Sequence, residues 1–200
     1  MATLGLTKSS LQREKARLMA FEKALPALDL KRQKLLAAKA VAGRALEESR
    51  SELTGLRREV PAQLPMLANR GIDLTDLVVV HEVFVGRQNV VGVLIPSWDG
   101  ARIESRVYSF LVRPHWVDRV ADLLARCAEL SLRTEVEKRR VDLLEEARRR
   151  ITQRVNLFEK VLIPRTRSNI RRIQVHLGDA ERAAVVRAKV AQRKRRRASA

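Results

Sequence analysis

Residues that could carry chemistry are few in this chain of 200 residues, and they are scattered. His81, His115 and His176 lie far apart, and none has metal-ligand spacing with another histidine or with the single cysteine, Cys127. The acidic pair Glu145–Glu146 lies in a charged segment with helical periodicity, where pairing with Arg or Lys on a solvated face is the ordinary role. The sequence also lacks the glycine-rich phosphate loop G-x-x-x-x-G-K-S/T. We therefore expect no catalytic residue, no bound metal and no cofactor.

Positive charge is the strongest chemical signal. The chain has 41 basic and 23 acidic side chains, a formal net charge of +18, and 12 of the basic ones lie in residues 165–200. The run Gln192–Arg197 could bind nucleic acid or an anionic membrane surface. It could equally be a solvated tail that aids solubility or meets an acidic protein, because no aromatic side chain that could stack on bases follows Phe158. Composition leaves these interpretations open.

The overall composition indicates helices. A hydrophobic fraction of 46% excludes wholesale disorder, whereas 4% aromatic residues and eight glycines argue against a β-sandwich or a cofactor-binding α/β fold. Charged residues at 32% are typical of long exposed helices with one apolar stripe. The lone cysteine fits a reducing compartment, and no stretch approaches the roughly 18 apolar residues of a membrane span. We expect a soluble, intracellular and mostly helical protein.

Apolar residues recur every seven positions between Leu11 and Val60, which predicts a coiled-coil helix. One seam comprises Leu11, Leu18, Leu25, Leu46, Leu53 and Val60, with Arg32 and Lys39 as interruptions. The other comprises Phe21, Leu28, Leu35, Ala42 and Leu56, with Ser49 as the interruption. Pro26 should bend this helix, and Pro61 and Pro65 should close it.

A second helix is predicted to begin at Pro114. One seam comprises Val120, Cys127, Thr134, Val141, Val155 and Leu162, with Arg148 as the misfit. The other comprises Leu123, Leu130, Leu144, Ile151 and Phe158, with Glu137 as the misfit. Beyond Pro164 the stripe continues as Ile170, Ile173 and Leu177, displaced by one residue, which we interpret as a stutter in the heptad phase. Gly178–Asp179 predicts a break before a short last helix and a basic tail.

Between the two helices the pattern changes to β-branched runs. Residues 77–85 and 90–95 are separated by Gly86–Asn89, which predicts a hairpin, closed downstream by Pro96 and a turn at Trp98–Gly100. Two rods joined by a compact insert bury their stripes most simply against each other. We expect an all-α-dominated fold: a long antiparallel two-helix coiled coil with a small central β-hairpin insert. Its parts are residues 1–60, the insert 61–113, the second helix 114–178, and a short helix with tail at 179–200.

Three blocks of the sequence form a recognisable set. Residues 153–165 read Q-R-V-N-L-F-E-K-V-L-I-P-R, and residues 89–96 read N-V-V-G-V-L-I-P. They resemble the R-R-V-N-A-L-E-x-V-x-I-P-R signature and the N-V-A-G-V-x-x-P segment of the D subunit of the V/A-type (vacuolar/archaeal-type) rotary ATPases. Thr7–Ser9, with Lys31–Arg32 and Leu35, is similar to that family's N-terminal helix. The blocks occur in the family's order and span nearly the whole chain.

The resemblance implies a non-catalytic rotor shaft. Such a central-stalk subunit transmits torque between a nucleotide-hydrolysing hexameric head, which receives both chain ends, and a membrane ring that translocates ions. The implied partners are the catalytic and non-catalytic nucleotide-binding subunits of the head, a smaller central-stalk subunit and a membrane-side rotor subunit. The implied location is peripheral, on the cytoplasmic face of the membrane, without membrane insertion. The implied partner-interface residues are Arg154, Asn156, Glu159, Pro164 and Arg165, with Asn89, Gly92 and Pro96 in the insert.

Two other functions compete with the shaft. A basic coiled-coil protein could bind nucleic acid through its tail and second helix, and its affinity would then fall steeply with salt. A homotypic coiled-coil scaffold would need seams that prefer self-association. Signature blocks in the family's order favour the shaft, for which no direct nucleic-acid binding is expected.

Overall fold

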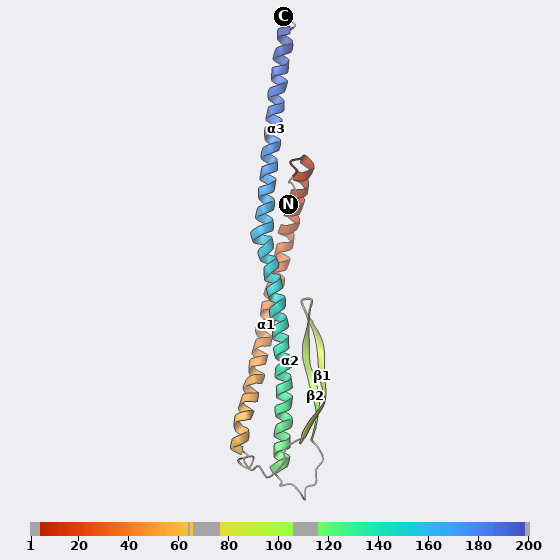
Figure 1. Cartoon of the computed structure of the whole chain (residues 1–200), viewed down its shortest axis with the longest axis vertical. Coiled ribbons are helices and arrows are strands. Elements are labelled where there is room, and N and C mark those ends of the chain that lie inside the picture. The colour runs from red at the N-terminus through yellow and green to blue at the C-terminus, as the bar shows by residue number, and fades with distance from the viewer. Residues whose placement is uncertain (1–4, 64, 66–76, 106–115, 199–200) are drawn as a thin grey trace. The chain divides into compact units, whose positions relative to one another are not determined.

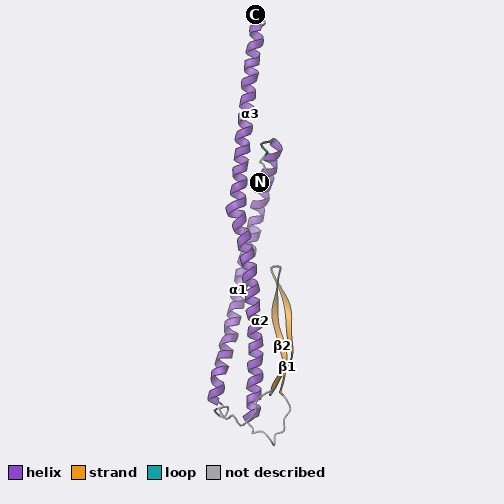
Figure 2. Ribbon diagram, viewed as in Figure 1, coloured by secondary structure: helices purple, strands orange, loops and turns teal. Residues whose placement is uncertain are grey.

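The computed structural model describes residues 5–63, 65, 77–105 and 116–198 (Figure 1). Its elements follow the order α1 (Lys8–Gln63), β1 (Val78–Val90), β2 (Val93–Ser105), α2 (Trp116–Leu157), the π-helical turn η2 (Phe158–Leu162) and α3 (Ile163–Ala198). Figure 2 shows that helix dominates and that the strands form one hairpin. The predicted fold class, antiparallel helices with a two-stranded insert, is confirmed. Pro114, the predicted start of the second helix, lies outside the described residues.

The chain divides into two compact units, and each is described by itself. The central unit comprises Arg32–Arg150, which includes the second part of α1, the hairpin and most of α2. The terminal unit combines the chain up to Lys31 with the chain from Ile151 onward, so that the first part of α1 pairs with η2 and α3. In both units the partner helices run antiparallel.

The core of the central unit lies where the hairpin begins. Leu53 and Leu56 of α1 pack there with Leu77, just before β1, and with the α2 residues Val117, Val120, Leu123 and Leu130. Cys127 packs against this cluster as a partly buried apolar residue. Farther along the helix pair, Leu35 and Leu144 are both 0% exposed. The predicted seams therefore face inward, because burying the two narrow stripes against each other removes their apolar surface from water.

The terminal unit continues the same kind of seam. Val155 and Ile173 are buried, and Phe21 of α1 meets Phe158 of η2 edge to face, with ring centroids 5.3 Å apart. The Arg167 guanidinium on α3 donates to Glu22 of α1 at 2.7 Å. These contacts join the first part of α1 to η2 and α3.

The first helix continues past both of its internal prolines. Pro26 lies inside α1, and the bend expected there stays a prediction. Pro61 was expected to close the helix, whereas α1 ends two residues later, at Gln63. A proline removes only its own N–H, and boundaries shift by one or two residues in the last turn.

The hairpin turn lies at Val91–Gly92, so the expected turn at Gly86–Asn89 is wrong. The φ angles of Val91 (54°) and Gly92 (81°) are both positive, as in a two-residue type I′ turn. Gly86 instead lies inside β1, where a Cβ atom would clash with the side chains of Ser97 and Asp99 on β2. The glycine therefore serves a close approach between strands, which a turn signal does not distinguish.

The expected turn at Trp98–Gly100 and the closure at Pro96 are also wrong. Both segments belong to β2, which continues to Ser105. The pairing register shifts between Phe84 and Val85, opposite Gly100 and Trp98, which leaves Asp99 as the extra residue of a β-bulge. A bulge absorbs the turn-forming residues without ending the strand.

The displaced stripe after Pro164 comes from a π turn rather than a stutter. In η2 the Ile163 N–H donates to the Phe158 carbonyl oxygen, five residues earlier. Pro164 has no N–H to donate to Lys160, and its ring would crowd that carbonyl in an α-helix. The wider turn holds one extra residue, so the seam moves by one position and continues inward at Ile173.

The break expected at Gly178–Asp179 is absent, because α3 continues to Ala198. An isolated glycine costs a helix only about 1 kcal/mol relative to alanine. The residues that follow are rich in Ala, Arg, Lys and Gln, which are good helix formers, and positive charge is favourable near a helix C-terminus. The predicted short helix and basic tail are therefore one continuous part of α3.

Burial of the seam predicts a sharp difference between two adjacent leucines. Replacing Leu35, which is fully buried, by alanine should lower the free energy of unfolding by about 2–5 kcal/mol, because it leaves a cavity between the helices. Leu36 is 55% exposed, so Leu36→Ala should change stability by less than about 1 kcal/mol. Urea unfolding followed by circular dichroism measures both. Equal losses would contradict the observed seam.

Candidate functional site

The part of the chain that the structure describes contains no cluster of three or more His, Cys, Asp or Glu side chains able to hold a metal ion. His81 Nε2 lies 3.3 Å from a carboxylate oxygen of Glu104 across the hairpin, and His176 is exposed on α3. His115 lies outside the described residues. Among the described helices, none combines the length and the apolar character of a membrane span.

The signature segment runs from the end of α2 through η2 into α3. Its apolar members Val155 and Ile163 are buried in the helix pair. Its polar and proline members are all exposed: Arg154, Asn156, Glu159, Pro164 and Arg165. The segment thus has a buried apolar face, which packs in the helix pair, and an exposed face that is accessible to a partner.

Arg165 lines a cleft of about 420 Å³ between α1 and α3 in the terminal unit. The Glu14 carboxylate, which is buried at a seam position, accepts hydrogen bonds in this cleft from Arg17 (2.8 Å) and Asn169 (3.2 Å). Arg13 also lines the cleft and donates to the hydroxyl of Ser10 at 3.2 Å. Three arginines against one carboxylate leave the cleft positively charged.

The C-terminal part of α3 forms a long basic surface. Every residue from Asp179 to Arg196 is exposed. Val185, Val186 and Val190 are large apolar residues among them, so the surface mixes apolar and basic groups. Lys8, in the first turn of α1, lies 3.9 Å from Glu181, so the described part of α1 begins level with this turn of α3.

The three candidate residues of the insert lie at or near the hairpin tip. The Asn89 side chain accepts a hydrogen bond from the Gly92 N–H at 2.8 Å, and Gly92 supplies a positive φ, so both residues build the turn. Pro96 is half-buried in β2 opposite Arg87. These residues belong to the central unit, whereas the signature residues belong to the terminal unit.

One strand of the hairpin exposes an apolar surface. Val83, Phe84 and Val85 of β1 are each at least 40% exposed, and Leu94 of β2 is also exposed. Ile95 of β2 is by contrast 1% exposed. The hairpin therefore buries Ile95 and leaves Val83, Phe84, Val85 and Leu94 uncovered in this chain.

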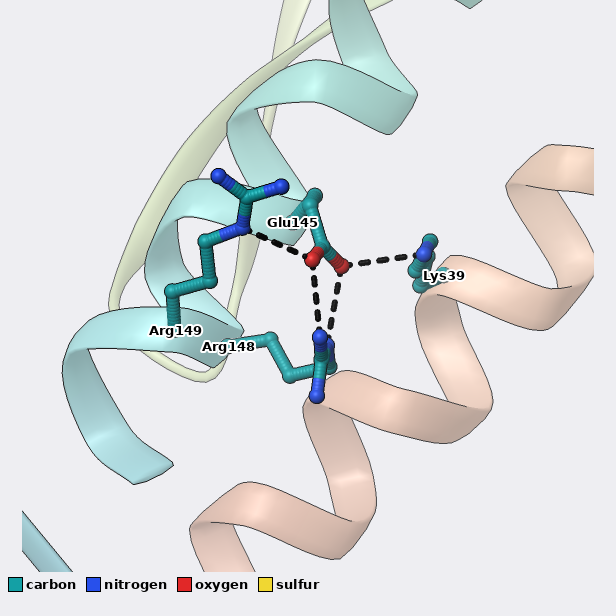
Figure 3. Close-up of polar contacts among 4 residues, drawn as sticks. All are labelled: Lys39, Glu145, Arg148 and Arg149. Atoms are coloured by element: carbon teal, nitrogen blue, oxygen red, sulfur yellow. Dashed lines mark hydrogen bonds and ion pairs between the residues drawn. The ribbon is translucent and has the colours of Figure 1, made fainter. Parts of the chain in front are cut away.

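The densest ion cluster joins α1 to α2 in the central unit (Figure 3). The Glu145 carboxylate accepts from both Arg148 (2.7 and 2.8 Å) and Arg149 (3.0 Å), and it lies 2.9 Å from Lys39 Nζ across the helix pair. Lys39 and Arg148 are two of the residues that interrupt the predicted seams. Sequence reasoning placed Glu145 on a solvated face, although two cationic interruptions at seam positions signalled a missing anion.

The cluster holds the Glu145 carboxyl group ionised. Hydrogen bonds from Arg148, then from Lys39 and Arg149, lower the pKa of Glu145 far below its ordinary value of 4.5. The carboxylate reciprocally raises the pKa of the Arg148 guanidinium. Because Lys39 belongs to the other helix, this cluster links the two rods as well as the residues of α2.

The lowered pKa predicts an acid-dependent loss of stability. The folded pKa of Glu145 lies below the unfolded one, so the stabilisation is present above about pH 4.5 and is lost as pH falls through the folded pKa. Thermal unfolding between pH 6 and pH 2 should therefore show a smaller decrease for Glu145→Gln than for the parent. Glu146→Gln is the matched control, because its pair with Arg150 is an exposed one at 3.4 Å. Identical pH profiles for Glu145→Gln and the parent would contradict the cluster.

Comparisons with known proteins identify the family. Residues 10–193 match the family model of the ATP synthase D subunit. The V-type ATP synthase D subunit of Borreliella burgdorferi is 32% identical over 191 residues, which cover 96% of this chain and 94% of that protein. The V-type ATP synthase D subunits of Chlamydia felis and Chlamydia muridarum are each 31% identical, over 200 and 196 residues, with 96% of this chain covered in both. The resemblance seen in the sequence blocks is confirmed, and the chain belongs to the ATP synthase D-subunit family, as a non-catalytic central-stalk subunit of a V-type rotary ATPase.

Proposed function

We propose that this subunit is the torque-transmitting shaft between the nucleotide-binding head and the membrane ring of the rotary complex. The proposal is supported by the paired helices of each unit and by α3, which continues, exposed and basic, beyond the first turn of α1. Two paired helices resist bending and twisting better than one. The cluster of Lys39 with Glu145 adds a polar link between them.

The basic end of α3 is the part proposed to turn inside the head. Its exposed Arg and Lys side chains can exchange polar contacts as the shaft rotates, whereas one deep apolar contact would lock it. Each exposed ion pair contributes only about 0–1 kcal/mol, so no single contact would hold the shaft at one angle. The signature residues Arg154 and Arg165, exposed around the π turn, are proposed to contact the head as well.

The exposed surface of β1 is proposed to bind another subunit of the complex, the smaller central-stalk subunit. Val83, Phe84 and Val85 are uncovered in this chain, and exposed apolar groups gathered on one strand favour a protein partner. A membrane-side rotor subunit is proposed as a further partner. With these partners the subunit would lie peripherally, on the cytoplasmic face of the membrane.

Neutralising the end of α3 should uncouple the machine. A fourfold variant, Arg187→Gln with Lys189→Gln, Arg193→Gln and Lys194→Gln, should reduce the number of ions transported per ATP hydrolysed in the reconstituted complex. The matched control neutralises four exposed basic residues of the central unit, Arg57, Arg58, Arg119 and Arg139, and should leave this ratio near that of the parent. Any single substitution of the four at α3 should have little effect.

A different pair of results would contradict the shaft proposal. Unchanged coupling in the fourfold variant, together with tight duplex DNA binding by the parent at physiological salt, would favour the nucleic-acid hypothesis. That binding should then weaken steeply with added salt and be lost in the fourfold variant.

The hairpin proposal has its own test. Phe84→Ser should weaken binding of the smaller central-stalk subunit by about tenfold, because loss of a buried aromatic contact at an interface costs more than about 1 kcal/mol. Helical circular dichroism should not change, because Phe84 is 49% exposed in the chain alone. Val79→Ser, farther down the same strand, is the matched control for a general change in β1. Isothermal titration calorimetry measures both, and equal affinities for parent and Phe84→Ser would exclude this surface.

A further inference from the structure

Two misfits of the predicted seams lie level with each other in the central unit. Ser49 of α1 is 0% exposed, and Glu137 of α2 is 7% exposed. The Lys39–Glu145 pair sets the register of these antiparallel helices. Counting ten residues forward from Lys39 and ten back from Glu145 pairs Ser49 with Glu135, within one turn of Glu137. A hydroxyl and a carboxylate thus occupy positions where the seam would otherwise be apolar.

This polar layer is incompletely satisfied by the residues that the structure describes. The Ser49 hydroxyl oxygen and Glu137 Oε2 are buried and have no hydrogen-bond partner among them. Burying a carboxylate in this way opposes helix pairing. A leucine at position 137 would instead continue the seam from Leu130 to Leu144. Glu137 therefore weakens the coiled coil locally, and any stabilising role of this residue must involve a contact other than helix pairing.

Arg140 connects this carboxylate to the hairpin. Its Nη1 lies 3.8 Å from Glu137 Oε1, and its Nη2 donates to Gln88 Oε1 of β1 at 2.9 Å. Its Nε is buried without a hydrogen-bond partner among the described residues, so the guanidinium is held between helix and hairpin.

Gln88 lies on the inward face of the hairpin. Its register partner in β2 is Ile95, and paired residues of an antiparallel ladder project to the same face of the sheet. The burial of Ile95, 1% exposed, shows that this face packs inward. The Arg140–Gln88 bond and the Ile95 contact therefore fasten the hairpin four residues or fewer from its turn at Val91–Gly92.

We propose that Arg140 is a positioning residue that holds the tip of the hairpin against α2, and that the buried Glu137 carboxylate orients Arg140 for this role. The seam thus lacks an apolar side chain at Glu137, and the carboxylate at that position instead helps to hold the hairpin in place. Val83 and Val85, an odd number of residues from Gln88, lie on the opposite face of β1 and are consequently presented in one direction. The proposal concerns the full chain alone and does not rest on the proposed rotary function.

Distance measurements between spin labels test the positioning role. Labels are placed on cysteines at Arg58 of α1 and Arg87 of β1, both exposed, in a Cys127→Ser background. Arg140→Met keeps the apolar stem and removes every donor, and it should raise the population with a displaced hairpin about three- to tenfold, the usual effect of one such hydrogen bond. Arg139→Met, at the exposed neighbouring position, should give the distance distribution of the parent. Equal distributions for Arg140→Met and the parent, or equal broadening in Arg139→Met, would overturn the proposal.

Glu137→Leu separates positioning from simple stability. It should raise or preserve the thermal unfolding temperature, because the seam becomes continuous, and it should still broaden the label distribution, because Arg140 loses its anchor. A purely structural role would move both readouts in the same direction. A parent-like distribution in Glu137→Leu, or a broadened one with a lower unfolding temperature, would overturn the role of Glu137.

Discussion

Everything in this chain depends on burying two narrow apolar stripes against each other. A stripe of one residue in every three or four cannot stabilise a long helix in water, so each helix needs the other. Leu35 and Leu144 become inaccessible to solvent through this pairing, and the base of the hairpin joins the same core through Leu77. The helix pairs are therefore tertiary structures, in which each helix is stabilised by its contact with the other.

Polar residues in the seams give the rod its specificity. An uninterrupted apolar stripe would allow the helices to slide by a heptad, whereas charges that must meet at one level prevent it. Lys39 and Arg148 meet Glu145 at one such level, and Glu14 meets Arg17 and Asn169 at another. The layer with Ser49 and Glu137 differs, because its groups are buried without full pairing and connect outward through Arg140.

The π turn before Pro164 shows how one proline changes the surface of the helix pair. A proline cannot complete the α-helical bonding pattern, and the widened turn shifts the seam by one residue. The apolar signature residues Val155 and Ile163 stay buried on either side of it. Arg154 and Arg165 are exposed, so the rod carries an irregular basic surface beside a continuous core. A uniform cylinder would present the same face at every angle of rotation, whereas an irregular surface presents a different one at each angle.

Periodicity in the sequence determined the helices and their seams, because a seven-residue repeat records which side chains must leave water. The compact insert between the two repeats indicated that the helices pair antiparallel. The family was suggested separately, by the resemblance of three sequence blocks, and neither observation could give the polar residues their contacts. Only the tertiary structure decided that Gly86 serves strand approach rather than a turn, and that Glu145 lies between two helices. These outcomes depend on neighbours distant in the sequence: the side chains of Ser97 and Asp99 for Gly86, and the Lys39 ammonium for Glu145. A local sequence pattern does not contain these neighbours. The same residues are compatible with several backbone conformations, and contact with the opposing helix or strand selects one of them.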